Sequence, residues 1–119
     1  MLTEARKQQL IETLSNLIQR RSYSGEEKEV VEYMEKIMKE VGYDTVHIDK
    51  YGNIIGSIKG KYAGPRILMD GHIDTVPVNA EKWTEKPFGG EVHDGKLFGR
   101  GTTDMKGSVC AMMLAGAYL

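Results

Sequence analysis

The sequence of this 119-residue chain predicts an α/β fold with a mostly parallel central sheet, flanked by helices and accompanied by a β-hairpin. Three observations support this prediction. Apolar residues at three- and four-residue spacing indicate two amphipathic helices early in the chain, and a third, apolar helix at its end. A short apolar run at residues 66–70 is typical of a strand that is covered on both faces. The pair Asp94-Gly95, between two short β-like segments, is a strong signal for a two-residue hairpin.

The first two helices are predicted from their apolar stripes. Residues 3–20 form the first helix, and Ser24 followed by Glu27 is expected to form a capping box that opens the second. The second stripe continues to Val41, and Gly42 is expected to end the helix. The apolar residues of the two stripes are Leu10, Ile11, Leu14, Leu17 and Ile18, then Val30, Val31, Met34, Ile37, Met38 and Val41.

The remaining elements follow from alternation and turn residues. Residues 45–49 alternate as a half-exposed strand with Val46 and Ile48 inward, and residues 54–58 are its expected hairpin partner. Residues 71–90 are expected to be irregular. The segment from 106 to 119 is apolar almost all round, so we expect a helix that is buried on every side, with Cys110 as a small buried hydrophobe.

Composition excludes several classes of partner. A formal net charge of -1 provides no electrostatic basis for binding nucleic acid or an anionic membrane. No apolar stretch reaches the roughly 18 to 20 residues that a transmembrane helix needs. The N-terminal residues lack the apolar core of a signal peptide. A single cysteine cannot form an internal disulfide, so we expect a cytoplasmic protein.

Two short motifs contain residue types that bind metals. Residues 71–77 place His72 and Asp74 two positions apart, directly after the apolar run, so both side chains can face one cleft. Residues 99–107 place Asp104 where a glycine-rich turn enters the last helix. Histidine and aspartate are typical zinc ligands. Each residue also has an ordinary interpretation, namely a loop histidine beside a turn aspartate, and an aspartate that caps a helix.

Taken together, residues 68–77 and 99–107 resemble the M20 metallopeptidases, the family of carboxypeptidase G2, acetylornithine deacetylase and succinyl-diaminopimelate desuccinylase. Residues 49–53, and Trp83 shortly before Pro87, match the family as well. The threonines at positions 102 and 103 are similar to those of its YgeY-type subgroup.

The resemblance implies a site with two zinc ions, in which Co²⁺ or Mn²⁺ could replace zinc. It makes His72 a ligand of one zinc, Asp104 the carboxylate that bridges both, and Asp74 the residue that orients His72. The peptide bond after Asp104 is cis in the family. The implied reaction is hydrolysis of amide bonds in small peptides or N-acyl amino acids. The family's general base, a glutamate, and its remaining ligands have no counterpart here.

We therefore expect residues 1–119 to be the N-terminal portion of a catalytic domain, without the rest of that domain and without the lid and dimerisation domain. Such a chain is expected to be inactive alone and to self-associate through its apolar last helix. His47 and His93 are expected to be surface residues. Two alternatives stay open: a deacetylase or desuccinylase of amino-acid biosynthesis, and a non-catalytic remnant or one half of a two-chain enzyme.

Overall fold

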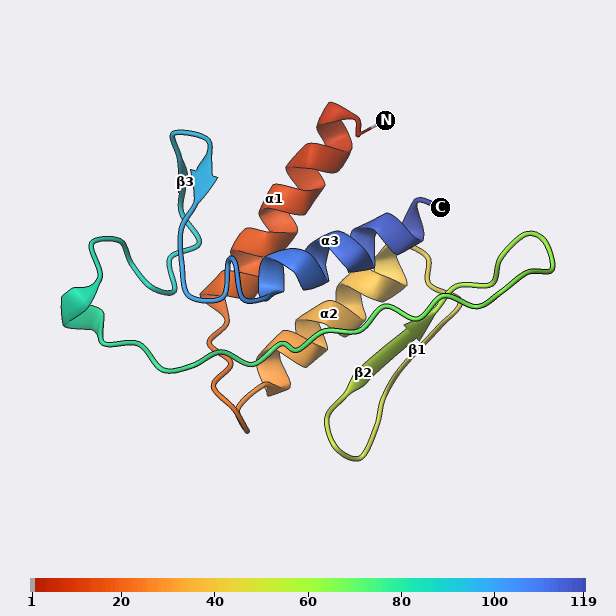
Figure 1. Ribbon diagram of the computed structural model, residues 1–119, viewed down its shortest axis with the longest axis horizontal. Helices are drawn as coiled ribbons and strands as arrows, with labels where there is room; N and C mark the ends of the chain where they lie inside the picture. The colour runs from red at the N-terminus through yellow and green to blue at the C-terminus, as the bar shows by residue number, and fades with distance from the viewer. Residues whose placement is uncertain (1) are drawn as a thin grey trace.

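Three helices and two small antiparallel sheets make up the computed structural model, which describes residues 2–119. The helices are α1 (Glu4–Gln19), α2 (Lys28–Glu40) and α3 (Lys106–Ala117). Figure 1 shows α3 lying between α1 and α2, with one hairpin beside α2 and the other on the far side of α1. The helix predicted over residues 3–20 is confirmed, and Thr3 caps it by accepting a hydrogen bond from the backbone N of Arg6.

The core forms where the apolar stripes of the three helices meet. Its centre consists of side chains that are nearly or fully buried, which confirms the two predicted stripes over most of their length. They are Leu17, Val30, Met34, Ile37, Met38, Val109, Cys110, Met113 and Leu114. Because these residues come from both ends of the chain, the core holds the last helix against the first two.

The start of α2 differs from the prediction. Its N-cap is Glu27, which makes no side-chain capping bond, so the capping box with Ser24 is wrong. Instead, the Ser24 hydroxyl donates to Asp74 Oδ2, and Glu27 accepts a hydrogen bond from the backbone N of Gly25. The end of the helix is as expected, because Gly42 adopts a φ of 92°, which side chains with a Cβ disfavour.

The first predicted hairpin is confirmed. Strand β1 (Thr45–Ile48) pairs antiparallel with β2 (Ile54–Ser57). Val46 is half-buried as predicted, but Ile48 is 39% exposed and does not point into the core. Figure 1 shows this hairpin next to α2.

The second predicted hairpin is also confirmed. Strand β3 (Val92–His93) pairs with β4 (Lys96–Leu97), and the two turn residues between them, Asp94 and Gly95, both have positive φ. Positive φ at both central positions is the requirement of the favoured hairpin turn. Residues 71–90 are irregular as expected, except for the short 3₁₀ helix η1 (Ala80–Lys82).

The mostly parallel central sheet is not found in the described part of the chain. The strand predicted at residues 66–70 has no regular secondary structure, and Ile67 and Leu68 are 82% and 90% exposed. A strand needs a neighbouring backbone for its hydrogen bonds, and no segment among residues 2–119 supplies one here. The one parallel pairing within those residues is an isolated bridge between Tyr23 and Thr75.

Helix α3 is buried on one side rather than on all sides. Val109, Cys110, Met113 and Leu114 are buried, whereas the exposed positions Ala111 and Ala115 carry small side chains. The prediction that this helix is buried on every side is therefore wrong. Alanine counts as apolar in the composition, but it is tolerated on a helix face that is exposed to water. None of the helices in residues 2–119 has the length and apolar character needed to cross a membrane.

Candidate metal centre

The two predicted metal ligands meet in the structure. Nε2 of His72 lies 2.9 Å from Oδ1 of Asp104. Their side chains are 48% and 86% exposed, so an ion in solution can reach both. Asp104 does not cap α3, because the N-cap is Met105 and it makes no side-chain capping bond. The ordinary interpretation of Asp104 as a helix cap is therefore wrong.

Asp74 contacts His72 from the other side of the ring. Nδ1 of His72 lies 3.1 Å from the main-chain oxygen of Asp74 and 3.3 Å from its carboxylate Oδ1. A carbonyl oxygen only accepts, so Nδ1 carries a proton and donates it. The 2.9 Å contact with Asp104 places a proton on Nε2 as well, and a metal ion that replaced this proton would be bound by both residues.

These contacts shift the pKa of both groups. The hydrogen bond to the main-chain oxygen of Asp74 raises the pKa of His72, and the hydrogen bond and charge of Asp104 add to this effect. The hydrogen bond from Ser24 lowers the pKa of Asp74, and the neighbouring His72 lowers it further. Asp74 is therefore held as a carboxylate that supports the imidazole.

The backbone around His72 is fixed by the connection between α1 and α2. The buried hydroxyl of Ser22 donates to the main-chain oxygen of Ile73 at 2.7 Å. The main-chain oxygen of Ser22 accepts from the backbone N of Thr75 at 2.8 Å. Two hydrogen bonds from one residue thus hold the segment that carries His72 and Asp74.

Asp104 lies in a tight turn before α3. Gly101 adopts a φ of 91°, and its main-chain oxygen accepts from the backbone N of Lys106 at 2.8 Å. The peptide bond between Asp104 and Met105 is cis, as the resemblance implied. The geometry of this turn presents the Asp104 carboxylate to solvent on the side where His72 lies.

Lys106 is the largest fully buried side chain of the described residues, at 1% exposure. Its ammonium donates to the main-chain oxygens of Leu17 and Arg20 at 2.9 and 2.7 Å. Burial lowers its pKa to about 8. The sequence predicted no role at this site for Lys106 or Ser22, and for Ser24 only a role in capping α2. For Lys106 the sequence did offer one signal, since a lysine at the start of an otherwise apolar helix indicates a specific partner.

A small cavity of about 270 Å³ contains the candidate ligands. His72, Asp74 and Asp104 line it together with Trp83 and Arg100. The Arg100 guanidinium lies over the Trp83 ring, 5.1 Å from its centroid. Arg100 Nε is buried and has no hydrogen-bond partner within residues 2–119.

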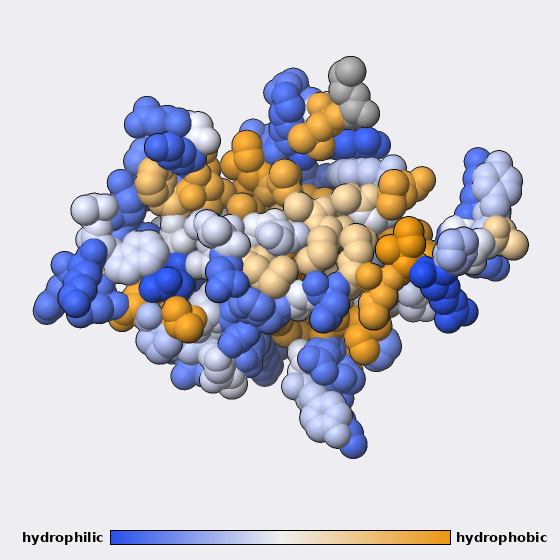
Figure 2. Space-filling model, in the orientation of Figure 1, coloured by the Kyte–Doolittle hydropathy of each residue, from blue (hydrophilic) through white to orange (hydrophobic). Residues whose placement is uncertain are grey.

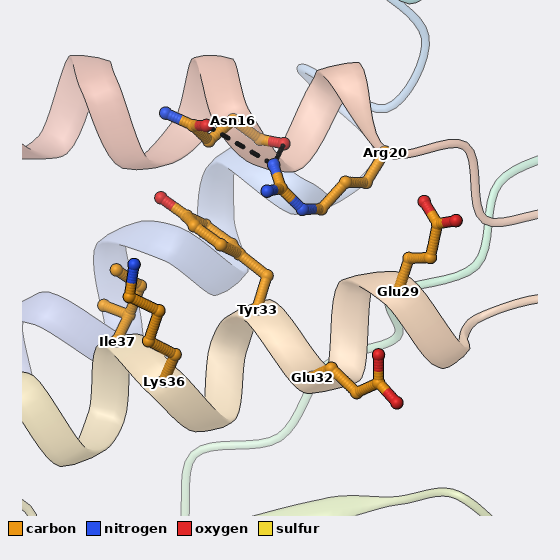
Figure 3. A pocket seen from close by; sticks show the side chains of 7 residues that line it. All are labelled: Asn16, Arg20, Glu29, Glu32, Tyr33, Lys36 and Ile37. Carbon is orange, nitrogen blue, oxygen red and sulfur yellow. Dashed lines mark hydrogen bonds between the residues drawn. The ribbon is translucent and has the colours of Figure 1, made fainter.

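A more open pocket of about 550 Å³ lies elsewhere, between α1 and α2 (Figure 3). Arg20 and Tyr33 line it, and the Arg20 guanidinium stacks on the Tyr33 ring at 4.2 Å. None of the candidate ligands reaches this groove.

The other two histidines lie outside the candidate site. His47 is an exposed residue of β1. His93 stacks on Phe98, with 4.2 Å between the ring centroids, and its Nε2 is 3.2 Å from a carboxylate oxygen of Glu85. Both are surface histidines, as expected.

The donor set suits zinc in type but is short in number. Imidazole nitrogen and carboxylate oxygen are ligands that zinc prefers, and a catalytic zinc takes about three protein ligands. Within residues 2–119, no group of three or more His, Cys, Asp or Glu side chains could hold a metal ion. The described residues thus fit one part of a zinc site.

Known proteins are similar to this chain over the segments that carry the candidate ligands. The sequence model of peptidase family M20/M25/M40 matches residues 68–119, which contain His72, Asp74 and Asp104. The protein YgeY of Escherichia coli (strain K12) is 41% identical over 100 residues, which are 82% of this chain and 24% of YgeY.

Two relatives carry the name of a deacylating enzyme. The succinyl-diaminopimelate desuccinylase of Cereibacter sphaeroides (strain ATCC 17029 / ATH 2.4.9) is 38% identical over 104 residues, 85% of this chain and 27% of that protein. The probable succinyl-diaminopimelate desuccinylase of Staphylococcus epidermidis is 33% identical over 118 residues, 96% of this chain and 29% of that protein. The chain thus spans about a quarter of the length of the relatives it matches.

Proposed function

Because the chain belongs to peptidase family M20/M25/M40, we propose that it supplies two metal ligands to a zinc-dependent hydrolase of small peptides or N-acyl amino acids. The ligands are Nε2 of His72 and the carboxylate of Asp104. Their distance of 2.9 Å is the observation that carries the proposal. Both side chains are open to solvent and come from segments 32 residues apart, which is the arrangement expected of ligands that converge on one ion.

The residues of this chain would bind the metal ions and orient the ligand side chains. Nδ1–H of His72 donates to Asp74, which keeps the ring in the orientation that directs Nε2 outward. Asp104 offers a carboxylate that is exposed enough to reach two ions. Zinc, when bound, polarises an amide carbonyl and lowers the pKa of a water molecule. Cobalt or manganese could take the same ligands, since all accept nitrogen and oxygen donors.

Further ligands and a general base are required for turnover, and we assign them to parts of the family's fold that this chain does not contain. The length of the relatives supports this assignment. A non-catalytic remnant, or one half of a two-chain enzyme, would carry the same two ligands. The expected compartment is the cytoplasm, because the single cysteine cannot form an internal disulfide.

A desuccinylase is the second candidate, and Arg100 is the observation that favours it. A succinyl amide carries a free carboxylate, and a guanidinium binds a carboxylate through two parallel hydrogen bonds. Arg100 lines the same cavity as His72 and Asp104. Several relatives, including the two described above, are named as desuccinylases, which supports this acyl group over an uncharged one.

Calorimetric titration of the chain with Zn²⁺ tests the main proposal. The unmodified chain is expected to bind zinc, and His72→Ala and Asp104→Ala are each expected to abolish measurable binding. His47→Ala is the matched control, because it removes an exposed imidazole outside the site. Zinc binding that is unchanged in Asp104→Ala, or lost equally in His47→Ala, would contradict the assignment.

A further inference from the structure

We propose that the connection between α1 and α2, residues 20–27, sets the relative position of the two metal ligands, with Ser24 and Lys106 as positioning residues. The inference rests on the proposed function for the identity of the ligands. Ser24 lies outside both metal-ligand motifs, and Lys106 lies in the second motif but was given no role there. The connection contacts the segment of His72 on one side and the segment of Asp104 on the other.

The contact with the His72 segment involves two serines. Ser22 holds the backbone at Ile73 and Thr75, as described above. The Ser24 hydroxyl donates to Oδ2 of Asp74 at 2.5 Å, while Oδ1 of the same carboxylate faces Nδ1 of His72. Because the two oxygens of one carboxylate have different partners, Ser24 determines how Asp74 presents itself to the imidazole.

The contact with the Asp104 segment is made by Lys106. The last turn of α1 contains no basic residue, and the Arg20 guanidinium that follows it donates to the Asn16 carbonyl, so the later carbonyl groups can accept from another cation. Lys106 supplies one, since its ammonium donates to the main-chain oxygens of Leu17 and Arg20. Lys106 follows Asp104 by two residues and has 1% exposure. Its anchoring therefore fixes the start of α3 and the turn that presents Asp104.

The connection is itself held in place. Nη1 of Arg20 donates to the main-chain oxygen of Asn16 at 2.7 Å, and the guanidinium stacks on Tyr33 of α2 (Figure 3). Arg21 forms an ion pair with Glu26 at 2.6 Å. The Arg20 contacts bind the connection to both helices, and the Arg21–Glu26 pair links two positions within it.

A Ser24 variant can distinguish an effect on the position of the ligands from an effect on folding. Its hydrogen bond to Asp74 lies at the exposed surface, where a single hydrogen bond makes only a small net contribution to stability. Removing the hydroxyl is therefore expected to leave the fold intact and to alter the site. Ser57→Ala is the matched control, because the Ser57 hydroxyl is also exposed and hydrogen-bonded, to Thr45 in the first hairpin.

The test uses nuclear magnetic resonance on the metal-free chain and compares the ring nitrogen shifts of its three histidines. Ser24→Ala is expected to move the His72 signals and leave those of His47 and His93 in place, with a melting temperature close to that of Ser57→Ala. Ser24→Thr, which keeps a hydroxyl, is expected to restore the His72 signals. Lys106→Met is expected to move them as well, with exposed Lys39→Met as its control.

Zinc titration provides the second readout. Ser24→Ala is expected to bind Zn²⁺ about tenfold more weakly than the unmodified chain. This is the lower end of the effect seen for residues that are hydrogen-bonded to the groups around a metal ligand. Unchanged His72 signals in Ser24→Ala, or a zinc affinity equal to that of Ser57→Ala, would overturn the proposal. If Lys106→Met does not fold, Ser24→Ala alone decides. If the unmodified chain binds no zinc, the proposed function fails, and the His72 signals still decide the positioning role.

Discussion

Nε2 of His72 lies 2.9 Å from Oδ1 of Asp104, although 32 residues separate them in the sequence. Neither residue lies in a strand of the structure, so no sheet register brings them together. Their segments are instead docked on a common support at the end of α1, through Ser22 and through Lys106. The relative position of the two ligands is therefore determined by hydrogen bonds to backbone oxygens and by helix packing.

The isolated chain is expected to hydrolyse neither dipeptides nor N-acyl amino acids, even with added Zn²⁺ or Co²⁺. Within residues 2–119 the site offers two ligands, whereas a catalytic zinc takes about three together with water. Assays of the purified chain by amine release measure this directly. Hydrolysis that disappears in His72→Ala would contradict the prediction.

Asp74→Asn is expected to weaken metal binding by about 10- to 100-fold while leaving the fold unchanged. The amide fills the same space, and the main-chain oxygen that accepts from His72 remains, but the negative charge beside the imidazole is lost. Zinc titration and circular dichroism of the variant measure the two effects. An unchanged zinc affinity would show that Asp74 only shapes the turn.

Gly101→Ala is expected to destabilise the chain more than Gly52→Ala, although both glycines have a φ near 90°. A Cβ at Gly52 would meet open space, so the cost there is about 1–2 kcal/mol of backbone strain. At Gly101 it would lie 2.8 Å from Cγ2 of the buried Thr75, which adds about 1–3 kcal/mol of overpacking. Denaturant unfolding of both variants measures the difference. Equal losses would show that Thr75 can move aside.

The Cys110 thiol is expected to react slowly with iodoacetamide at pH 8 and rapidly once the chain is unfolded. Cys110 is fully buried, and burial raises its pKa to about 12. The thiol of the unfolded chain ionises near pH 9.0, so between that pH and about 12 the folded state binds more protons. The contribution of Cys110 to the free energy of unfolding therefore falls as the pH rises through this range.

Cys110→Ala removes this titration. Its free energy of unfolding is expected to fall less steeply above pH 9 than that of the unmodified chain. Denaturant unfolding at several pH values measures both slopes. Parallel slopes, or fast labelling of the native thiol at pH 8, would show that the helix opens easily at this position.

Self-association is expected to involve residues 66–70 rather than α3. The large side chains of α3 are covered by the core, whereas Ile67 and Leu68 are almost fully exposed. Figure 2 shows apolar side chains gathered on one face of the molecule. Burying an isoleucine or leucine contributes about 1.5–3 kcal/mol, and large exposed apolar patches are rare on monomers.

Light scattering of the chain and of the double variant Ile67→Lys, Leu68→Lys measures this effect. The unmodified chain is expected to form dimers or larger species, and the variant a monomer. Ile11→Lys is the control, since Ile11 is an exposed apolar residue on α1, away from this segment. A monomeric unmodified chain would contradict the prediction.

The local elements and the candidate ligands were predictable from the sequence alone. The stripes of α1 and α2 follow from helical periodicity, and the Asp94-Gly95 turn follows from the positive φ that both positions need. His72, Asp74 and Asp104 stood out because their residue types and spacing are those of a metal site. These signals are local, since each depends on residues that are neighbours in the chain.

Other features could be known only from the tertiary structure, because they depend on residues that are far apart in the sequence. Ser24 has the spacing of a helix cap, yet it pairs with Asp74, because the packing of α1 and α2 brings the connection onto that segment. Lys106 lies in an apolar helix, and its burial is tolerated because its ammonium donates hydrogen bonds to the main-chain oxygens of Leu17 and Arg20 at the end of α1. Residues 66–70 have the composition of a buried strand but lack a partner backbone, and a strand forms only where one is supplied.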